Sequence, residues 1–461
     1  LFFLMIRRPP RSTLFPYTTL FRSLSCLVIG LLLAGCGTGT SGKQEENGIN
    51  GGAISIETVK AKELQEPAYG QEDPEALAVA GGANDFAFQL SASLAGQAGD
   101  ENFVCSPYSV WMPLAALVNA TDAPNKAALL TALSAAGISE DEINQAASRM
   151  LYDLTNQREK KYAEEQGEQF HDPLKIANAI FVGKNVSLKK DFAQVFMDYY
   201  RGSVLNVDFD SPQAVQAVNK WAAENTEGLI SDIVQEFEPE TVAALANAIY
   251  FSDRWDWEFD PEKTTEDVFH SPGGETKAFY MLREGDGQRN YEDDRVQAMP
   301  LRFKTGGGLY IILPKDGDAK GLLTSMTSEY FEEISRGSSN ASGKLLLPRF
   351  SIESPVMQLK DTLTTLGVPL FDKTAAPLTG GLLEEKIPAW LSSAAHKAVI
   401  EVDEKGTTAA AVTVVAVGAT SMPLPTEPFE MNCNKPFVFV LYGDTYDGGN
   451  QILFTGIVNR P

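Results

Sequence analysis

Hydrophobic and polar residues repeat along most of this chain with one of two periods, and the period separates candidate helices from candidate strands. Helical spacing predicts helices over residues 107–120, 125–136, 213–224 and 357–366. Asn84-Asp85 is expected to cap a further amphipathic helix that runs to Leu94, and Ser139 with Glu142 has the spacing of a capping box. Apolar, β-prone runs predict strands over residues 175–182, 242–251, 309–313, 345–352, 396–402, 436–442 and 451–458.

The order of these elements indicates the fold class. Helices come first, strands dominate the last third of the chain, and no regular strand–helix–strand alternation is present. We therefore predict an α+β fold with large mixed or antiparallel sheets, in a single domain that covers residues 84–461.

Residues 1–23 differ from the rest of the chain, because they follow neither period. They resemble a translated sequencing-adapter fragment, so we interpret them as a non-native segment and leave them out of the predicted fold. The alternative is that they form a long basic n-region of a signal peptide, with Arg7, Arg8, Arg11 and Arg22 as its charges.

An export signal follows this segment. Leu24 to Leu33 is an apolar run of about ten residues, which is too short to span a bilayer but suits the core of a signal peptide. It ends in Leu33-Ala34-Gly35-Cys36, which matches the lipobox of bacterial lipoproteins. We predict a signal peptide over residues 24–35, lipidation of Cys36, and a flexible Gly-, Ser- and Glu-rich tether over residues 36–83. The expected location is a membrane-anchored, exported one: cell surface, periplasm or extracellular space.

The charge and the cysteine content of the chain bear on its possible partners and on its possible disulfides. The chain has 61 acidic against 38 basic residues, a net charge of -23, which repels phosphate backbones and argues against nucleic-acid binding. Cys26 and Cys36 belong to the signal region, which leaves Cys105 and Cys433. These two could form a disulfide or remain as two buried free thiols, and the sequence favours neither.

No enzyme motif is present. The sequence has only three histidines and lacks zinc-binding, P-loop, dinucleotide and nucleophile-elbow patterns. Asp253, Asp256, Glu258 and Asp260 could supply a glycosidase pair, although a solvated segment after a strand explains them more simply. We therefore expect no catalytic activity, no metal and no cofactor.

The most unusual segment begins at Glu404. Small residues crowd residues 407–413, β-branched residues continue to Val417, and glycine and prolines interrupt residues 418–425. Ordinary strands are predicted on both sides. This sequence suits a segment that is an exposed loop in one state and a strand in another.

Here the chain resembles the serpin family. The reactive-loop hinge of that family runs Glu, any residue, Gly, Thr, any residue, then small residues and Thr, and the matching residues are Glu404, Gly406, Thr407, Ala409, Ala410, Ala411 and Thr413. Two departures are Thr408, where many inhibitors have Glu, and Val412, where a smaller residue is usual. Further family motifs resemble the segments that begin at Asn102, Leu245, Phe269, Leu347, Ala395, Asn434 and Phe454.

The resemblance implies a single serpin-type domain with eight to nine helices packed on three sheets and an exposed reactive-centre loop. It implies a monomer that inhibits a serine protease, or a cysteine protease, in a covalent 1:1 complex after the cleaved loop inserts into the main sheet. Thr407, Ala409, Ala411, Thr413, Val415 and Val417 would then share the buried face of the inserted strand. By the same resemblance, Ser106, Ser109, Asn247 and His396 form a hydrogen-bonded cluster that controls sheet opening, and Trp255 marks the place where the loop enters.

The family register also identifies the bait. The scissile residue lies fourteen residues after the hinge glycine, which gives Thr420, with Ser421 next. A small uncharged bait residue favours an elastase-, subtilisin- or chymotrypsin-like target over a trypsin-like one. Two other hypotheses remain: a non-inhibitory serpin that is a binding or structural protein with a loop that is only cut, and an unrelated surface hydrolase that would turn over substrate continuously.

Overall fold

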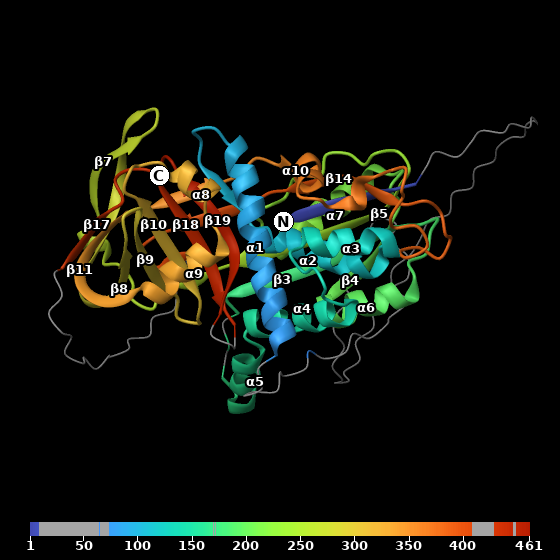
Figure 1. The fold of residues 1–461 in the computed structure, drawn as a ribbon, viewed down its shortest axis with the longest axis horizontal. Helices are drawn as coiled ribbons and strands as arrows, with labels where there is room; N and C mark the ends of the chain where they lie inside the picture. The colour runs from blue at the N-terminus through green and yellow to red at the C-terminus, as the bar shows by residue number, and fades with distance from the viewer. Residues whose placement is uncertain (9–63, 65–72, 169, 171, 408–427, 446–448) are drawn as a thin grey trace, which may run out of the picture.

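The fold was described from a computed structural model, which covers residues 1–8, 64, 73–168, 170, 172–407, 428–445 and 449–461. These residues form ten α-helices and three β-sheets. The α+β prediction with three sheets is confirmed, whereas the expected number of helices, eight to nine, was slightly too low. Figure 1 shows α1 crossing the middle of the molecule, with the largest sheet on one side and most of the helices on the other.

The helices have the following bounds: α1 (Pro74–Gln97), α2 (Pro107–Leu117), α3 (Ala123–Ala132), α4 (Glu140–Leu154), α5 (Gln157–Gln166), α6 (Lys190–Tyr200), α7 (Pro212–Asn225), α8 (Ala319–Thr324), α9 (Ser328–Gly337) and α10 (Lys360–Thr365). The predicted capping box is present at the start of α4, where Ser139 and Glu142 satisfy each other's backbone N–H groups.

The main sheet has six strands in the order β13 (Met357–Gln358), β14 (Trp390–His396), β1 (Phe2–Arg7), β5 (Thr241–Phe251), β3 (Leu174–Gly183) and β4 (Gly202–Val207). A four-stranded sheet continues it at one end, with the order β12 (Phe350–Glu353), β15 (Val399–Val402), β16 (Gly406–Thr407) and β6 (Asp253–Arg254). Since β15 follows β14 and β6 follows β5 along the chain, the place between β14 and β5, which β1 fills, is continuous with the place between β15 and β6, which β16 fills.

The third sheet runs β17 (Phe429–Asn432), β11 (Ser339–Pro348), β8 (Gly274–Glu292), β9 (Val296–Arg302), β10 (Gly308–Pro314), β18 (Phe437–Asp444), β19 (Asn450–Val458) and β2 (Phe103–Cys105), with β7 (Thr265–Ser271) paired to β8. It packs through β19 and β18 against α1, α2 and α8.

The N-terminal segment corrects the sequence interpretation. Residues 1–23 were left out of the predicted fold, yet Phe2–Arg7 form a central strand of the main sheet, antiparallel to both β14 and β5. Phe2, Leu4 and Ile6 are completely buried, and each buried side chain of this size contributes about 1.5–3 kcal/mol. The exclusion of this segment from the fold was therefore wrong; its adapter-like origin stays a prediction, and residues 9–23 lie outside the described part.

The tether and the first helix also need correction. The predicted tether extended to residue 83 with a helix cap at Asn84, but α1 begins at Pro74 and is capped by Asp73, whose side chain accepts a hydrogen bond from the Ala76 N–H. Gly82, which was interpreted as part of the tether, lies inside this helix. A Cβ there would come within 2.2 Å of the Ser134 carbonyl oxygen, so glycine allows close packing at this point.

Both cysteines of the domain are free and buried, which resolves the alternative left open by the sequence. Cys105 contacts Ser91 and Thr455, and burial raises its pKa to about 11. Burial also raises the pKa of Cys433. Among the helices that the structure describes, none is both long and apolar enough to cross a membrane.

Candidate functional site

The candidate hinge lies between β15 and β6, where its first residues form β16 of the four-stranded sheet. After β15 the chain turns through residues 403–405 and returns as β16, in which Thr407 pairs with Val402 on one side and with Asp253 on the other. Thr407 is only 2% exposed. The hinge therefore already occupies the first positions of a strand between the two halves of the sheet, and it runs toward the main sheet.

Trp255 stabilises this turn through two hydrogen bonds. Its indole Nε1 donates to the Asp403 carbonyl at 2.9 Å, and its backbone N–H donates to the Lys405 carbonyl at 2.8 Å. The completely buried ring stacks on Phe303, with the ring centroids 4.6 Å apart. The structure thus places Trp255 next to the hinge, where the resemblance located it.

Glu404 fixes the other side of the turn. Its carboxylate accepts hydrogen bonds from Arg349 Nε at 2.7 and 2.9 Å and from the Thr264 hydroxyl at 2.6 Å. Burial alone would raise the pKa of this carboxyl, but the bonds from Arg349 and Thr264 outweigh burial and hold the pKa below its usual value. Glu404 therefore anchors the turn between β15 and β16 to Arg349 and Thr264.

Gly406 is required by a close approach of two backbones. A Cβ at this position would lie 1.9 Å from the Asp253 carbonyl oxygen and 2.8 Å from the Arg254 Cα. A larger residue would therefore separate β16 from β6. This steric reason adds to the backbone freedom expected for a hinge glycine.

His396 is held as a neutral imidazole deep in the sheet. Its Nδ1 donates to the Leu1 carbonyl at 2.8 Å, and its Nε2 accepts the Ser106 backbone N–H at 2.9 Å. A second proton would face the Ser106 N–H, and burial lowers the pKa of His396 well below its ordinary value. The Ser106 hydroxyl donates to the Leu453 carbonyl at 2.8 Å, which joins this group to β19.

The other two cluster residues do not join this network. Asn247 is on β5, across β1 from His396, and its Nδ2 donates to Asn178 Oδ1 at 2.8 Å. The Asn247 Oδ1 and the Ser109 hydroxyl are buried without a hydrogen-bond partner among the described residues. The expectation of a single hydrogen-bonded cluster was thus wrong for this arrangement, because β1 separates the two halves; a role in sheet opening stays a prediction.

Sequence reasoning missed a polar chain beside this cluster. Asn178 Nδ2 donates to the Tyr200 carbonyl at 2.6 Å, the Tyr200 hydroxyl donates to Asn144 Oδ1 at 2.8 Å, and Asn144 exchanges hydrogen bonds with Asn119. It connects β5 and β3 to α6, α4 and the end of α2. The signal in the sequence was three asparagines and a tyrosine at apolar positions, where unpaired polar groups are costly.

Several predicted residues lie outside the described part of the chain. These are the reactive bond, Thr420 and Ser421; the later hinge residues, Ala409, Ala410, Ala411 and Thr413; and the lipidation site, Cys36. The same holds for the signal peptide over residues 24–35 and for most of the tether.

Three of the four acidic residues considered as a glycosidase alternative have structural partners. Asp253 accepts a hydrogen bond from the Thr305 N–H at 3.1 Å, Glu258 pairs with Arg254 at 2.5 Å, and Asp260 caps a short 3-10 turn at Glu262. These three carboxylates are used locally, which weakens the support for a catalytic pair.

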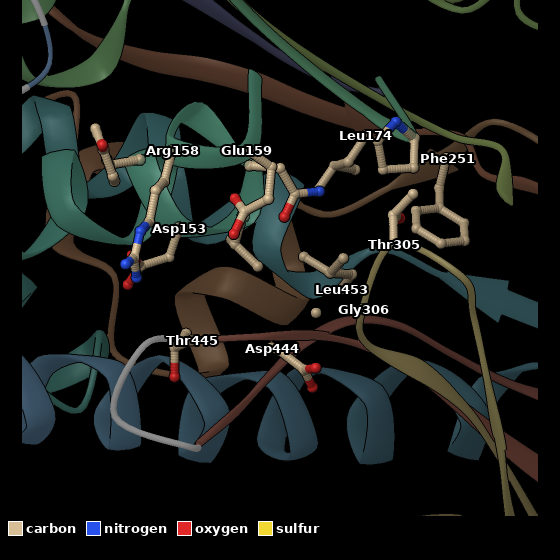
Figure 2. A pocket seen from close by; sticks show the side chains of 15 residues that line it. Asp153, Arg158, Glu159, Leu174, Phe251, Thr305, Gly306, Asp444, Thr445 and Leu453 are labelled. Carbon is tan, nitrogen blue, oxygen red and sulfur yellow. The ribbon is translucent and has the colours of Figure 1, made fainter. Parts of the chain in front are cut away.

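A polar cavity of about 210 Å³ lies elsewhere, between the end of α4 and the turn before β10 (Figure 2). Asp153, Glu159 and Asp444 line it, and Asp444 is paired with Arg302 at 2.7 Å. Its described lining contains no histidine, serine or cysteine, and no group of metal-binding side chains occurs among the residues that the structure describes. The cavity therefore gives no independent support to the hydrolase hypothesis.

Comparison with known proteins agrees with this geometry. The family model described as "Serpin (serine protease inhibitor)" matches residues 81–461. Alpha-1-antitrypsin 1-4 of Mus musculus is 29% identical over 83% of this chain and 90% of its own length, and the plasma serine protease inhibitor of Bos taurus is 28% identical over 85% and 93%.

Solved structures have the same fold. A structure described as cleaved Serpin 42Da matches with a TM-score of 0.69 at 25% identity, over 84% of this chain and 99% of that one. The thermophilic serpin tengpin in its native state matches with a TM-score of 0.69 at 24% identity, over 87% and 98%. Human thyroxine-binding globulin in complex with thyroxine matches with a TM-score of 0.70 at 24% identity, over 84% and 99%.

Proposed function

Because this chain belongs to the serpin family, we propose that it inhibits a serine endopeptidase by acting as a suicide substrate. The target's serine hydroxyl attacks the Thr420 carbonyl, an acyl-enzyme forms, and the amine of Ser421 leaves. The freed loop then enters the main sheet and carries the protease with it before water can hydrolyse the ester. A cysteine protease could react through a thioester in the same sequence of steps.

The observation that carries this proposal is the position of Gly406–Thr407. These residues pair between β15 and β6, in line with the place between β14 and β5 where the mechanism requires a strand to insert. The next residues are small in sequence, which removes steric resistance to entry. About ten residues that each gain partners on both edges would release on the order of 10 kcal/mol, at about 1 kcal/mol per hydrogen bond.

The test is covalent trapping. The protein is mixed with elastase-, subtilisin-, chymotrypsin- and trypsin-like proteases, and we expect an adduct that survives SDS with one or more of the first three. Mass spectrometry of the released peptide should locate the cut at Thr420–Ser421. Cleavage without any adduct would contradict the inhibitory mechanism.

A hinge variant separates trapping from cleavage. Thr407→Arg places a charge where only 2% of the side chain is exposed, so we expect cleavage to continue and adduct formation to be lost. Glu430→Arg, which changes an exposed residue on β17, is the matched control and should still trap. Undiminished trapping by Thr407→Arg would exclude strand entry at this hinge.

A second candidate function is a non-inhibitory serpin that binds a partner and whose loop is only cut. The observation that favours it is β1, which occupies the centre of the main sheet and obstructs a full-length inserted loop. The same assay decides between the two candidates, because this one predicts cleavage without an adduct under all conditions.

We also propose that the protein is exported and anchored through a lipid on Cys36. The support is the apolar run and lipobox at residues 24–36, and the acidic tether-like sequence that follows. Mass spectrometry of the membrane-associated protein should find the chain beginning at a lipidated Cys36; a chain that retains residues 24–35 would contradict this.

A further inference from the structure

The strand β1 fills the place that an inserting loop needs. It pairs with β14 from Phe2–His396 to Arg7–Trp390 and with β5 from Phe2–Asn247 to Arg7–Thr241. Leu1 extends the contact: its terminal amino group donates to the Lys397 carbonyl at 2.8 Å, and its carbonyl accepts a hydrogen bond from the Lys397 N–H at 3.0 Å. Figure 1 shows this N-terminal strand inside the sheet, beside β14.

The register of the hinge identifies which loop residues β1 replaces. Thr407 pairs with Val402 and Asp253, whereas Phe2 pairs with His396 and Asn247. His396 is six residues before Val402, and Asn247 is six residues before Asp253. A loop that continued from Thr407 as a regular antiparallel strand would therefore bring residue 413 to the position of Phe2, and both neighbouring strands give the same answer.

The faces of the two segments also coincide. Phe2, Leu4 and Ile6 point into the principal core, and by their register with β5 they occupy the positions of Thr413, Val415 and Val417. Phe3 points to the other face, toward the cluster that contains Phe181 and Trp221. Since the same alternate positions would be buried in either case, the N-terminal segment fits the opening in the orientation expected of the loop, with larger side chains.

Two ion pairs stabilise the C-terminal end of β1. Arg7 pairs with Glu238 at 2.6 Å and Arg8 with Glu240 at 3.0 Å, and the Arg8 N–H donates to the Glu240 carbonyl at 3.2 Å. At the N-terminal end of β1, a small cavity lies between Leu1 and Thr407, and Ile249, Val399 and Ile400 line it. By the register above, Leu1 takes the position of residue 412, so that β1 does not reach the four positions between Leu1 and Thr407.

We propose that, in the chain that still carries residues 1–35, the segment Leu1–Arg8 is an intramolecular competitor for the loop-insertion site. It must leave the sheet, or be removed by the cleavage before Cys36 proposed above, before a cleaved loop can insert beyond residue 411. This proposal rests on the proposed function for its consequence, but the occupancy of the sheet can be measured separately. While the segment is docked, β1 occupies the place between β14 and β5. Its release is then the step that permits trapping.

A reversible cross-link tests the proposal without disturbing the core. Met5 and Ser393 are partly buried, directly paired residues on β1 and β14, and paired Cα atoms lie about 4.5–5.5 Å apart, which a disulfide can bridge. In the full chain, with residues 1–35 retained, the oxidised form of the double variant Met5→Cys/Ser393→Cys should lose at least tenfold in the rate of adduct formation, and reduction should restore it. Equal rates in the two forms would overturn the proposal.

A destabilised strand provides the converse test. Leu4→Asp puts a charge at a completely buried position that is solvated once the segment leaves, whereas Leu77→Asp makes the same change at a residue that is 43% exposed. We expect Leu4→Asp to reduce the hydrogen-exchange protection of β5 and β14 and to speed adduct formation at least tenfold, and Leu77→Asp to do neither. An added peptide with the sequence of residues 1–8 should restore protection and slow trapping.

The two readouts distinguish failure of this proposal from failure of the proposed function. In one outcome, Leu4→Asp loses hydrogen-exchange protection of β5 and β14, the peptide restores it, and no variant forms an adduct. This outcome would support the competing strand and reject inhibition. Protection of β5 and β14 that is the same in Leu4→Asp and in the unchanged protein would overturn the competing strand, whatever the outcome with proteases.

Discussion

His396 shows how a single residue is fixed by hydrogen bonds to two separate segments, the N-terminal strand β1 and the start of α2. Its two ring nitrogens are committed to the backbone groups of Leu1 and Ser106, so that only the neutral form fits. By the register of the hinge, the carbonyl of Val412 would replace that of Leu1 after insertion. The ring could thus bond either strand, and it does not by itself favour one of them.

The lowered pKa of His396 predicts a loss of stability in acid. The unfolded chain binds a proton at this residue below its ordinary pKa of about 6.5, and the folded chain does not, so that stability falls by up to about 1.4 kcal/mol per pH unit as the pH decreases below that value. We expect His396→Gln to flatten this part of the pH dependence in urea unfolding between pH 7.5 and 4.5.

Two neighbouring charged groups bear on this measurement. Burial lowers the pKa of the Leu1 amino group to about 5, so it titrates in the same range, and its charge also lowers the pKa of His396. Lys397 pairs with Asp232 at 2.7 Å and Glu353 at 2.8 Å. These groups are present in both proteins, so their titration cancels in the comparison. Identical slopes in the two proteins would show that His396 accepts a proton in the folded state.

At the scale of elements, the turn between β15 and β16 is the support of the hinge. Glu404→Ala removes the acceptor for Arg349 and Thr264, and we expect it to cost about 1–3 kcal/mol of unfolding free energy. It should also increase the rate at which proteases cut the following loop. Lys405→Ala, at the exposed neighbouring residue, is the control and should change stability by less than about 0.5 kcal/mol. A Glu404→Ala protein as stable as the control would mean that Trp255 alone holds the turn.

Local patterns predicted those elements whose signal is contained in their own residues. The capping box of α4 and the apolar runs of β3, β5 and β10 were predicted within one or two residues. The predicted helix over residues 357–366 shrank to α10, because Met357–Gln358 pair with β14 as β13. Pairing with a distant strand is not visible in the local period.

The two larger errors have the same kind of cause. Phe2–Arg7 are buried on both faces of a central strand, so they have no alternation of polar and apolar residues to recognise. The start of α1 contains Gly81 and Gly82, which indicate flexibility by composition, yet Gly82 is explained by its contact with Ser134. The hydrogen bonds of Trp255 to residues 403 and 405 agree with its predicted place beside the hinge, whose role stays a prediction. The motif resemblance could not show that β1 separates His396 from Asn247.

At the scale of the whole molecule, the mechanism requires that the intact protein is not its own most stable form. Cutting the loop should let it insert, and about 10 kcal/mol of added stability corresponds to a rise in melting temperature of roughly 10 °C or more in a domain of this size. We expect the cut Leu4→Asp protein to show this rise by calorimetry. A cut protein that melts no higher than the intact one would remove the energetic basis of trapping.

The two buried thiols have a practical consequence for watching such rearrangements. Cys105 lies beneath α1 and next to β19, whereas Cys433 follows β17, at the far side of the largest sheet, with its N–H bonded to the Leu346 carbonyl at 2.9 Å. Neither is joined to a second sulfur, and both are shielded from solvent. An alkylating reagent would therefore react only as fast as each neighbourhood exposes its sulfur. The increase in mass of the two tryptic peptides, followed over time, would therefore report separately the rates of local opening at opposite ends of the domain.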